Sequence, residues 1–496
     1  MRMTTRFTVV LLAALVAIPL SPLGTAEETD PVLAIVTHGS FPSFDGVLIH
    51  YTAFQPGGAS ATDPVPVILH SHGWGGSRAK DIGGSVEMML LAGYGVVSFD
   101  ARGHGQSGGV ATVHHKDHEV KDSIALLDEI HDTMPWVAKE TTSGVDKDIV
   151  AGAIGGSYGG AYQLLAATYD DRLDALVPQM TWNDLRYSLA PNGVVKSVWV
   201  DALYGAGKAK ARIHSDIDRW FFEATATNQI PQDALDHFAG SNPDPSAIDA
   251  PTLLVQGIPD VLFNLNEGIA NYAGLKAAGT ETALVTYLGG HVIPGVQPLG
   301  FVGPQRGGEP CGAYADLAIT WFDKHLRGNN AADVPTGVSF ALENGECLQI
   351  AGLEQRIHNS YALGDLPLPN NAGSILVPVD VGTGVLAGVP RLGATYTGLE
   401  EARFFVSLVL VDDQGRSRII DDQSTPFRVF GSGLVSEAIN VDLAGVATRI
   451  DAGDQLFLRI DGANEWYATS GSRTLAPGVL DDVTLELQFA EGTGLP

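Results

Sequence analysis

One stretch of the sequence joins an apolar run to a glycine-rich turn with a serine at its centre. Ile149 to Ile154 predicts a short buried strand, and Ala161 to Tyr169 favours a helix. Between them lies Gly155-Gly156-Ser157-Tyr158-Gly159. A strand that turns sharply through glycines and a serine into a helix is the pattern of a nucleophile elbow, in which a Cβ at position 155 or 159 would clash with a neighbouring element. The alternative is a glycine-rich turn with an incidental serine, and the rest of the chain has to decide.

Predicted strands and helices alternate on both sides of this stretch. The expected strands are residues 47–54, 65–70, 94–99, 173–177, 252–256 and 283–288, and the expected helices are residues 117–132, 266–278 and 313–326. Such alternation predicts the α/β fold class, with a parallel, doubly wound sheet. Between residues 182 and 245 the pattern is helical and aromatic without strand runs, which indicates an inserted helical lid.

The predicted secondary-structure pattern of the sequence changes near residue 330. Short β-rich runs then alternate with Gly, Asp and Pro turns, and helical periodicity is absent. We therefore expect an α/β-hydrolase domain over residues 27–330, with the lid at about 182–245, followed by an all-β sandwich or jelly-roll domain over residues 331–496.

The N-terminus has the features of a secretory signal peptide. Arg2 and Arg6 flank an apolar run from Phe7 to Leu20, and Gly24-Thr25-Ala26 offers a small-residue cleavage site. We expect residues 1–26 to be removed and the mature protein to be secreted. The apolar run is short for a membrane span and no second long one follows, so stable membrane insertion is not expected; an uncleaved anchor is the alternative.

Charge and cysteine content narrow the classes of partner. Acidic residues outnumber basic ones 57 to 29, a formal net charge of −28, and such a surface repels phosphate backbones, so nucleic acid is excluded as an expected partner. The two cysteines, Cys311 and Cys347, either pair in the oxidising environment of a secreted protein or remain two separate buried thiols.

An acid and a histidine follow Ser157 in the order that serine hydrolysis requires. Asp260 comes just after the strand ending at Gln256, and His291 comes just after the next strand. The carboxyl ends of parallel strands meet at one edge of the sheet, where sites form. A serine nucleophile needs a base to take its proton and a carboxylate to orient that base. We therefore predict a catalytic triad of Ser157, His291 and Asp260 rather than a loop cap and a turn residue.

The tetrahedral intermediate of acyl transfer also needs two backbone donors. One is expected from Tyr158, the residue after the nucleophile, and the other from Trp74 in the loop His72-Gly73-Trp74-Gly75-Gly76. The Trp74 indole alternatively forms a wall of the acyl pocket or is purely structural. We predict Trp74 and Tyr158 as the oxyanion hole.

Other polar motifs are interpreted as structural. Asp100 and Arg102 are expected to pair with each other or to bind loop backbone. Three nearby histidines, His114, His115 and His118, resemble a metal cluster, but adjacent loop histidines rarely reach tetrahedral geometry without further ligands. We expect no metal and no cofactor.

Several motifs together resemble the S15 peptidase and cocaine-esterase-like group of α/β-hydrolases, which includes Xaa-Pro dipeptidyl-peptidases. The matching pieces are the segments 100–109, 155–160, 251–260, 290–291 and 321–328. The C-terminal β region resembles the jelly-roll domain of that family. The resemblance implies the triad Ser157, Asp260 and His291, a helical lid and no metal.

The sequence departs from that group at two points. Many cocaine-esterase-like members supply a tyrosine hydroxyl to the oxyanion hole, whereas the corresponding loop here contains Trp74. No carboxylate is identified for a substrate's free amine, although Asp216, Asp218 and Glu223 in the lid are candidates. The leading hypothesis is a secreted serine hydrolase that cleaves a small-molecule ester or peptide. The alternatives are a carboxylesterase or polyester-type esterase without peptidase activity, and an inert binding protein that uses its β domain.

Overall fold

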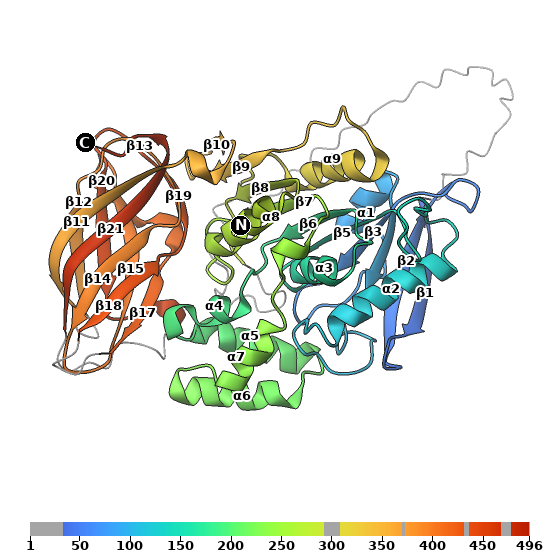
Figure 1. The fold of residues 1–496 in the computed structure, drawn as a ribbon, viewed down its shortest axis with the longest axis horizontal. Helices are drawn as coiled ribbons and strands as arrows, with labels where there is room; N and C mark the ends of the chain where they lie inside the picture. Colours follow the sequence, from blue (N-terminus) through green and yellow to red (C-terminus); the bar gives the residue numbers. More distant parts are fainter. Residues whose placement is uncertain (1–32, 292–307, 370–372, 431–435, 468–477, 496) are drawn as a thin grey trace, which may run out of the picture. The chain divides into compact units, whose positions relative to one another are not determined.

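The computed structural model describes residues 33–291, 308–369, 373–430, 436–467 and 478–495 (Figure 1). The predicted signal peptide, residues 1–26, lies outside these residues. The N-terminal part of the described chain forms a mixed ten-stranded sheet with the order β1-β2-β4-β3-β5-β6-β7-β8-β9-β10. Its strands are β1 (Ala34–Pro42), β2 (Leu48–Pro56), β3 (Val67–Ser71), β4 (Gly95–Phe99), β5 (Ala151–Gly156), β6 (Ala175–Gln179), β7 (Thr252–Gly257), β8 (Thr282–Tyr287), β9 (Gly337–Ala341) and β10 (Cys347–Ile350).

The centre of this sheet is parallel and its two ends are antiparallel. Every neighbouring pair from β4 to β9 is parallel, whereas β1–β2, β2–β4 and β9–β10 are antiparallel. The predicted α/β fold class with a doubly wound sheet is confirmed. Because the central strands run the same way, β5, β7 and β8 end at the same edge.

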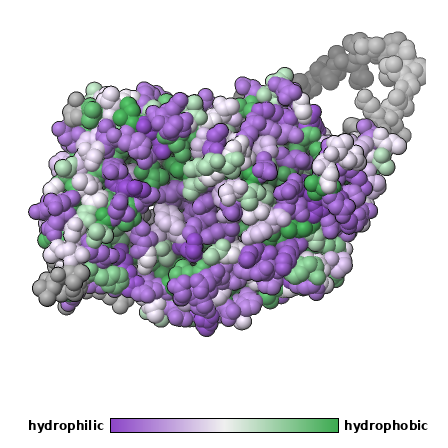
Figure 2. All heavy atoms as spheres, in the orientation of Figure 1, coloured by the Kyte–Doolittle hydropathy of each residue, from purple (hydrophilic) through white to green (hydrophobic). Residues whose placement is uncertain are grey.

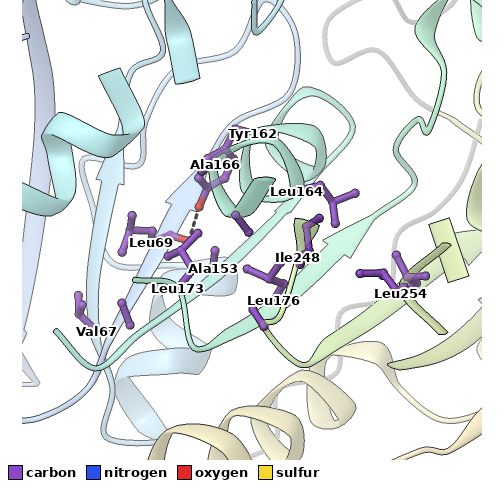
Figure 3. Close-up of a cluster of buried hydrophobic side chains, with 14 of the residues drawn as sticks. Val67, Leu69, Ala153, Tyr162, Leu164, Ala166, Leu173, Leu176, Ile248 and Leu254 are labelled. Carbon is purple, nitrogen blue, oxygen red and sulfur yellow. Dashed lines mark hydrogen bonds between the residues drawn. The ribbon is translucent and has the colours of Figure 1, made fainter. Parts of the chain in front are cut away.

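Helices cover both faces of the sheet because successive side chains of a strand point to opposite sides. On β3, Val67 and Leu69 belong to one buried cluster and Ile68 to another. The first cluster includes α3, whose Tyr162 hydroxyl donates to the Leu69 carbonyl oxygen at 2.8 Å (Figure 3). The second cluster includes Trp321 of α9. The helices that pack on the sheet are α1 (Gly84–Leu91), α2 (Glu119–Thr133), α3 (Tyr158–Tyr169), α8 (Leu265–Ala278) and α9 (Tyr314–Arg327).

A run of helices is inserted between β6 and β7, in the region predicted as the lid. We call it the helical insertion. Its elements are α4 (Leu185–Leu189), η1 (Pro191–Gly193), α5 (Ser197–Lys210), α6 (Ser215–Thr227), α7 (Gln232–Ala239) and η2 (Pro245–Ala247).

The C-terminal part of the chain, orange to red in Figure 1, folds into two antiparallel sheets. Their inner faces share one buried core, to which β21 contributes Leu485 and β20 contributes Leu458. We call this the β domain. The first sheet contains β11 (Ile357–Pro367), β13 (Gly384–Gly388), β14 (Arg391–Thr397), β18 (Glu437–Asp442), β19 (Val446–Ile450) and β21 (Val479–Gly492), and the second contains β12 (Ser374–Val379), β15 (Ala402–Val411), β16 (Ser417–Ile419), β17 (Thr425–Val429) and β20 (Gln455–Asp461). Short helices are η3 (Leu353–Gln355), η4 (Ile420–Asp422) and η5 (Glu465–Tyr467).

The large sheet continues past residue 331, where we expected the β domain to begin. Strand β9 pairs in parallel with β8, and β10 then pairs with β9. A disulfide joins Cys311, ahead of α9, to Cys347 at the start of β10. The bridge therefore ties the last strand of the large sheet to the segment that precedes α9, and the question of whether these cysteines pair is answered.

Candidate functional site

Ser157 lies at the sharp turn between β5 and α3. Its backbone has φ 58° and ψ −122°, a conformation that L residues rarely adopt and that other contacts must hold in place. The turn packs tightly because Gly159 has no side chain: a Cβ there would lie 2.4 Å from the Ser71 carbonyl oxygen at the end of β3. The elbow predicted from the glycine pattern is thus formed by backbone approaching backbone.

Replacing Gly159 by alanine should destabilise the fold by more than about 2 kcal/mol, because a backbone oxygen cannot move aside as a flexible side chain can. The matched control is Gly205→Ala in α5, where nothing lies within 4 Å of the added Cβ. That change should instead stabilise the protein by about 0.5–1 kcal/mol, the usual preference of a helix for alanine. Urea denaturation measures both, and similar effects of the two substitutions would contradict the packing argument.

The structure brings Ser157, His291 and Asp260 together in a hydrogen-bonded row. The Ser157 Oγ lies 2.8 Å from the His291 Nε2, and the His291 Nδ1 lies 2.9 Å from Asp260 Oδ2. The other carboxylate oxygen, Oδ1, accepts the backbone N–H groups of Leu262 and Phe263 at 2.9 and 3.0 Å. Asp260 is fully buried. Its two oxygens therefore have separate tasks: one is held by the turn, and the other faces the imidazole.

The two residues predicted to supply the oxyanion donors, Trp74 and Tyr158, line the same pocket as Ser157. Tyr158 is the first residue of α3, so its amide is among the N–H groups that have no acceptor inside the helix. Gly73 lies beside the serine, since a Cβ on it would be 4.0 Å from the Ser157 Cβ. Among the backbone hydrogen bonds of the described loops and helix ends, none uses the amide of Trp74 or Tyr158. The Trp74 indole donates to the Leu203 carbonyl oxygen at 2.8 Å, which ties the loop to the helical insertion.

A pocket of about 880 Å³, open solvent included, begins at Ser157 and extends under the helical insertion. Trp74 and Tyr158 line it near the serine, so the Trp74 indole does form part of its wall. Apart from Ser157, its lining residues are aliphatic or aromatic, among them Leu185, Leu203, Ile217 and Phe221. None of the described residues that line it is charged.

The structure does not bring the predicted amine-binding carboxylates to this pocket. Asp218 pairs with Lys208 at 3.0 Å, while Asp216 and Glu223 approach Arg219 at 3.9 and 3.7 Å. All three carboxylates are substantially exposed, and none lines the pocket. They are satisfied on the outer surface of the helical insertion.

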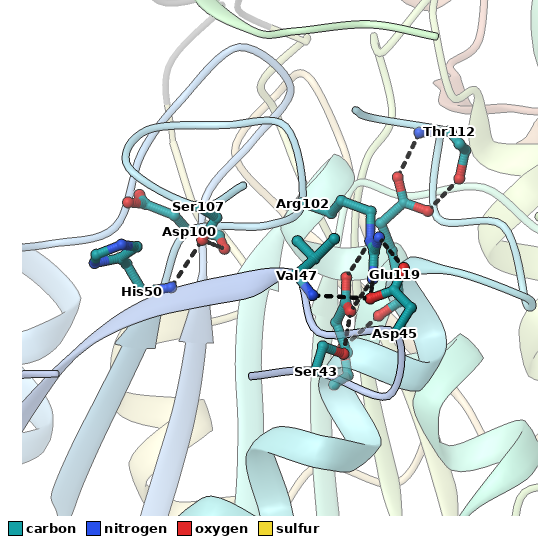
Figure 4. Close-up of polar contacts among 11 residues, drawn as sticks. Ser43, Asp45, Val47, His50, Asp100, Arg102, Ser107, Thr112 and Glu119 are labelled. Atoms are coloured by element: carbon teal, nitrogen blue, oxygen red, sulfur yellow. Dashed lines mark hydrogen bonds and ion pairs between the residues drawn. The ribbon is translucent and has the colours of Figure 1, made fainter. Parts of the chain in front are cut away.

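Asp100 and Arg102 do not pair with each other, so that alternative is wrong. Arg102 binds Asp45 at 2.7 Å (Figure 4) and Asp122 at 2.6 Å, and Asp100 pairs with Arg78. Asp100 also accepts two backbone N–H groups, including that of Gln106 at 2.9 Å. The expectation that this motif binds loop backbone therefore holds for Asp100. The contacts of Asp100 and Arg102 stabilise the loop after β4, and neither residue lines the pocket.

The three histidines singled out in the sequence do not form a metal site. Among the described residues, no group of three or more His, Cys, Asp or Glu side chains is placed to hold a metal ion. His115 stacks on His237, and His118 precedes α2. His114 instead stacks on the Tyr158 ring with 3.5 Å between ring centroids, and its Nε2 donates to the Tyr158 carbonyl oxygen at 2.8 Å. Burial lowers the pKa of His114 well below its ordinary value, so the ring is neutral.

A strained segment beside the serine was not expected from the sequence. Val113 and His114 both have positive φ, 63° and 52°, which is an outlier for a β-branched residue such as valine. In this backbone conformation Val113 lines the pocket and the His114 ring stacks on the Tyr158 ring. Glu119 holds the segment by accepting the Thr112 N–H at 2.5 Å and the Thr112 hydroxyl (Figure 4). No local sequence pattern indicates that Glu119 holds this segment.

Glu119 should make stability depend on pH. Burial raises its pKa from 4.5 to about 7, against the opposing hydrogen bonds from Thr112. The unfolded chain then loses this proton at lower pH than the folded one, so the free energy of unfolding falls as pH rises from about 4.5 to about 7, by on the order of 3 kcal/mol. In Glu119→Gln that part of the fall should disappear. Urea denaturation at a series of pH values tests this, and parallel curves for both proteins would contradict it.

Comparison with known proteins places this geometry in a family. Residues 45–293, half of the chain, match the family described as X-Pro dipeptidyl-peptidase (S15 family). A non-heme chloroperoxidase of Streptomyces lividans is 28% identical over 262 residues, which are 49% of this chain and 89% of that protein. A CocE/NonD family hydrolase from Staphylococcus aureus has a similar structure, with TM-score 0.67, 14% identity, and coverage of 92% of this chain and 94% of the other. An aminopeptidase from the marine sediment archaeon Thaumarchaeota archaeon gives TM-score 0.67 at 13% identity, over 95% and 98% of the two chains.

None of the helices in the described ranges is long and apolar enough to cross a membrane. On the face shown in Figure 2, hydrophilic residues predominate and apolar ones form separate patches.

Proposed function

This chain belongs to the X-Pro dipeptidyl-peptidase (S15) family of hydrolases, and we propose that it is a secreted serine hydrolase that cleaves esters of hydrophobic carboxylic acids. The observation that carries the proposal is the row Ser157–His291–Asp260 opening into a pocket whose described lining includes no charged side chain. The row supports acyl transfer by a serine, and the pocket supports a neutral, apolar acyl group.

Each group in the row has one task in the proposed reaction. His291 holds its Nδ1 proton toward Asp260, so its Nε2 accepts the Ser157 hydroxyl proton as Oγ attacks the ester carbonyl. Asp260 stabilises the imidazolium that forms. The amides of Tyr158 and Trp74 donate to the oxyanion, and the His291 proton then passes to the departing alcohol. Water, activated by the same imidazole, releases the acid from Ser157.

The apolar pocket favours esters over N-terminal dipeptides. A dipeptidyl substrate carries an ammonium group at the far end of its acyl group, one residue beyond the carbonyl that is attacked, and burying an unpaired ammonium costs several kcal/mol. The described lining offers no carboxylate to receive it, and Asp216, Asp218 and Glu223 are paired elsewhere. The family description favours the second candidate, an X-Pro dipeptidyl-peptidase. An inert binding protein is disfavoured by the 2.8 Å hydrogen bond between the Ser157 Oγ and the His291 Nε2.

Secretion is supported by two separate features. The N-terminal residues 1–26 have the charge and hydropathy pattern of a signal peptide. The Cys311–Cys347 bridge suits an oxidising compartment. Mass analysis of protein recovered from the culture medium should find a chain that begins at Glu27; a full-length chain retained in cells would contradict this part of the proposal.

The proposed activity can be tested with one probe and two substrates. A fluorophosphonate should label the wild-type protein at Ser157, and labelling should disappear in Ser157→Ala. A medium-chain aryl ester should be hydrolysed, whereas a dipeptidyl-proline anilide should not. A folded wild-type protein that is not labelled by the probe would contradict the serine mechanism. Faster turnover of the anilide would instead favour the dipeptidyl-peptidase.

A further inference from the structure

We propose that Gln423 of the β domain is a positioning residue for Asp260, so that the β domain helps to hold the catalytic acid in place. The proposal rests on the triad function given above. Gln423 follows η4 and is 4% exposed. It reaches into the other domain and binds the turn that carries the acid.

The contact is made to the backbone of that turn. The Gln423 Nε2 donates to the carbonyl oxygens of Ile258 and Asp260 at 3.0 and 3.1 Å. An amide NH₂ has two protons, so one side chain satisfies both acceptors. Because the two neighbours are acceptors, only the NH₂ group can face them, which sets the orientation of the amide.

The turn depends on such contacts because it has little regular structure of its own. Three side chains from different elements bind its carbonyl groups. Gln256, at the end of β7, donates to the Phe263 carbonyl oxygen at 2.7 Å, and Lys196 of the helical insertion donates to that of Leu262 at 2.8 Å. Gln423 binds the side of the turn that precedes and includes Asp260.

The backbone of the turn in turn orients the carboxylate. Asp260 Oδ1 is held by the N–H groups of Leu262 and Phe263, which leaves Oδ2 for the imidazole of His291. A shift of the turn therefore moves the carboxylate relative to His291. Displacements of about 1 Å at such sites can cost about 10²-fold in rate.

The β domain is fastened at this point by further contacts. Asn266, at the start of α8, donates to the Leu443 carbonyl oxygen at 2.9 Å and accepts the Gly445 N–H at 2.6 Å. Trp466 of the β domain stacks on Trp199, with 6.2 Å between the ring centroids. The Trp199 ring meets the His291 ring edge-on at 5.7 Å. The β domain thus supports both the acid and the base of the row.

The first test replaces Gln423 by methionine, which keeps the length of the side chain and removes its donors. On a medium-chain aryl ester, kcat should fall by about 10-fold to 10²-fold while KM changes by less than about 2-fold, since substrate does not touch this residue. The control is Gln488→Met, the same change elsewhere in the β domain. Gln488 bonds to Val389 and Arg356 and makes no contact with the Asp260 turn. Equal kcat values for wild type and Gln423→Met would overturn the proposal.

A double-mutant cycle separates positioning from a general structural role. If Gln423 acts through Asp260, adding Gln423→Met to Asp260→Asn should change kcat by less than about 2-fold, because the group being positioned is already lost. A loss of the same size in both backgrounds would show that Gln423 only supports the fold, and would overturn the proposal. Wild-type labelling by a fluorophosphonate is measured alongside, so that failure of the serine mechanism itself is recognised separately.

Gln423→Glu gives an independent signature and serves where Gln423→Met does not fold. A protonated carboxyl can donate one hydrogen bond to the two carbonyl oxygens, whereas a carboxylate donates none. The ratio of variant to wild-type kcat should therefore fall by about 5-fold or more between about pH 6 and about pH 9, as the introduced carboxyl loses its proton. A ratio independent of pH would contradict a donor role for Gln423.

Discussion

Replacing Ser157 by alanine should lower kcat for an aryl ester by about 10⁴-fold to 10⁶-fold, because the covalent route is lost and only the oxyanion donors and binding remain. The Ser157 Oγ is the only atom of that side chain within hydrogen-bond reach of His291. KM should change little, since the hydroxyl contributes little to binding of the apolar acyl group. Steady-state kinetics at high enzyme concentration measures both constants.

The row should also behave as one unit. His291→Ala should cost about as much as Ser157→Ala, and the double variant should be no slower than either, because each change alone already removes the covalent route. Ser241→Ala, a buried serine of the segment between α7 and η2, is the matched control and should keep wild-type kcat within about 2-fold. Losses that multiply in the double variant would show that Ser157 and His291 act independently.

The second large effect should be discrimination against a positive charge on the acyl group. An aryl ester of hexanoic acid should have a kcat/KM about 10³-fold higher than the ester of 6-aminohexanoic acid, which follows from several kcal/mol for burying an unpaired ammonium. The described lining has aliphatic and aromatic side chains and no carboxylate. Equal values for the two esters, or a preference for the charged one, would contradict the assignment of the pocket.

A substitution in the pocket lining should change this discrimination between the two esters. Ile217 lines the pocket from α6, and Ile217→Asp should reduce the discrimination by at least about 10-fold by giving the ammonium a partner. Phe222→Asp on the same helix is the control, because Phe222 is 62% exposed and does not line the pocket. The control should leave the ratio of the two kcat/KM values unchanged.

Much of the fold could be predicted from local pattern. Every strand and helix expected in residues 47–326 is present within a few residues of its expected bounds, because hydrophobic periodicity is imposed by burial on each face. The family resemblance read from the motifs is also confirmed. Strand β1 and helix α1 were missed. In β1 most side chains are exposed, so its apolar alternation is weak. Helix α1 begins at Gly84, and its N-cap Gly83 supplies no side-chain cap.

The candidate site was predictable where residues follow strands in sequence. Ser157, Asp260 and His291 each come after a parallel strand, and parallel strands end at the same edge, so their meeting depends on topology alone. Arg102 was not assigned its partners, because Asp45 and Asp122 are brought to it by folding from 57 and 20 residues away. The amine-binding candidates in the lid were acidic in sequence, but their side chains face cations on the outer surface.

The sequence by itself therefore determined the fold class, the family and the order of the candidate triad residues, because these depend on local periodicity and on glycines that permit a sharp turn after β5. Only the tertiary structure decided what surrounds Ser157. Three features join residues that are far apart in the chain. They are the apolar lining of the pocket, the stacking of His114 on the Tyr158 ring, and the hydrogen bond from Gln423 to the Asp260 turn. Contacts of that kind leave no pattern in the local sequence, because the interacting residues become neighbours only in the folded protein.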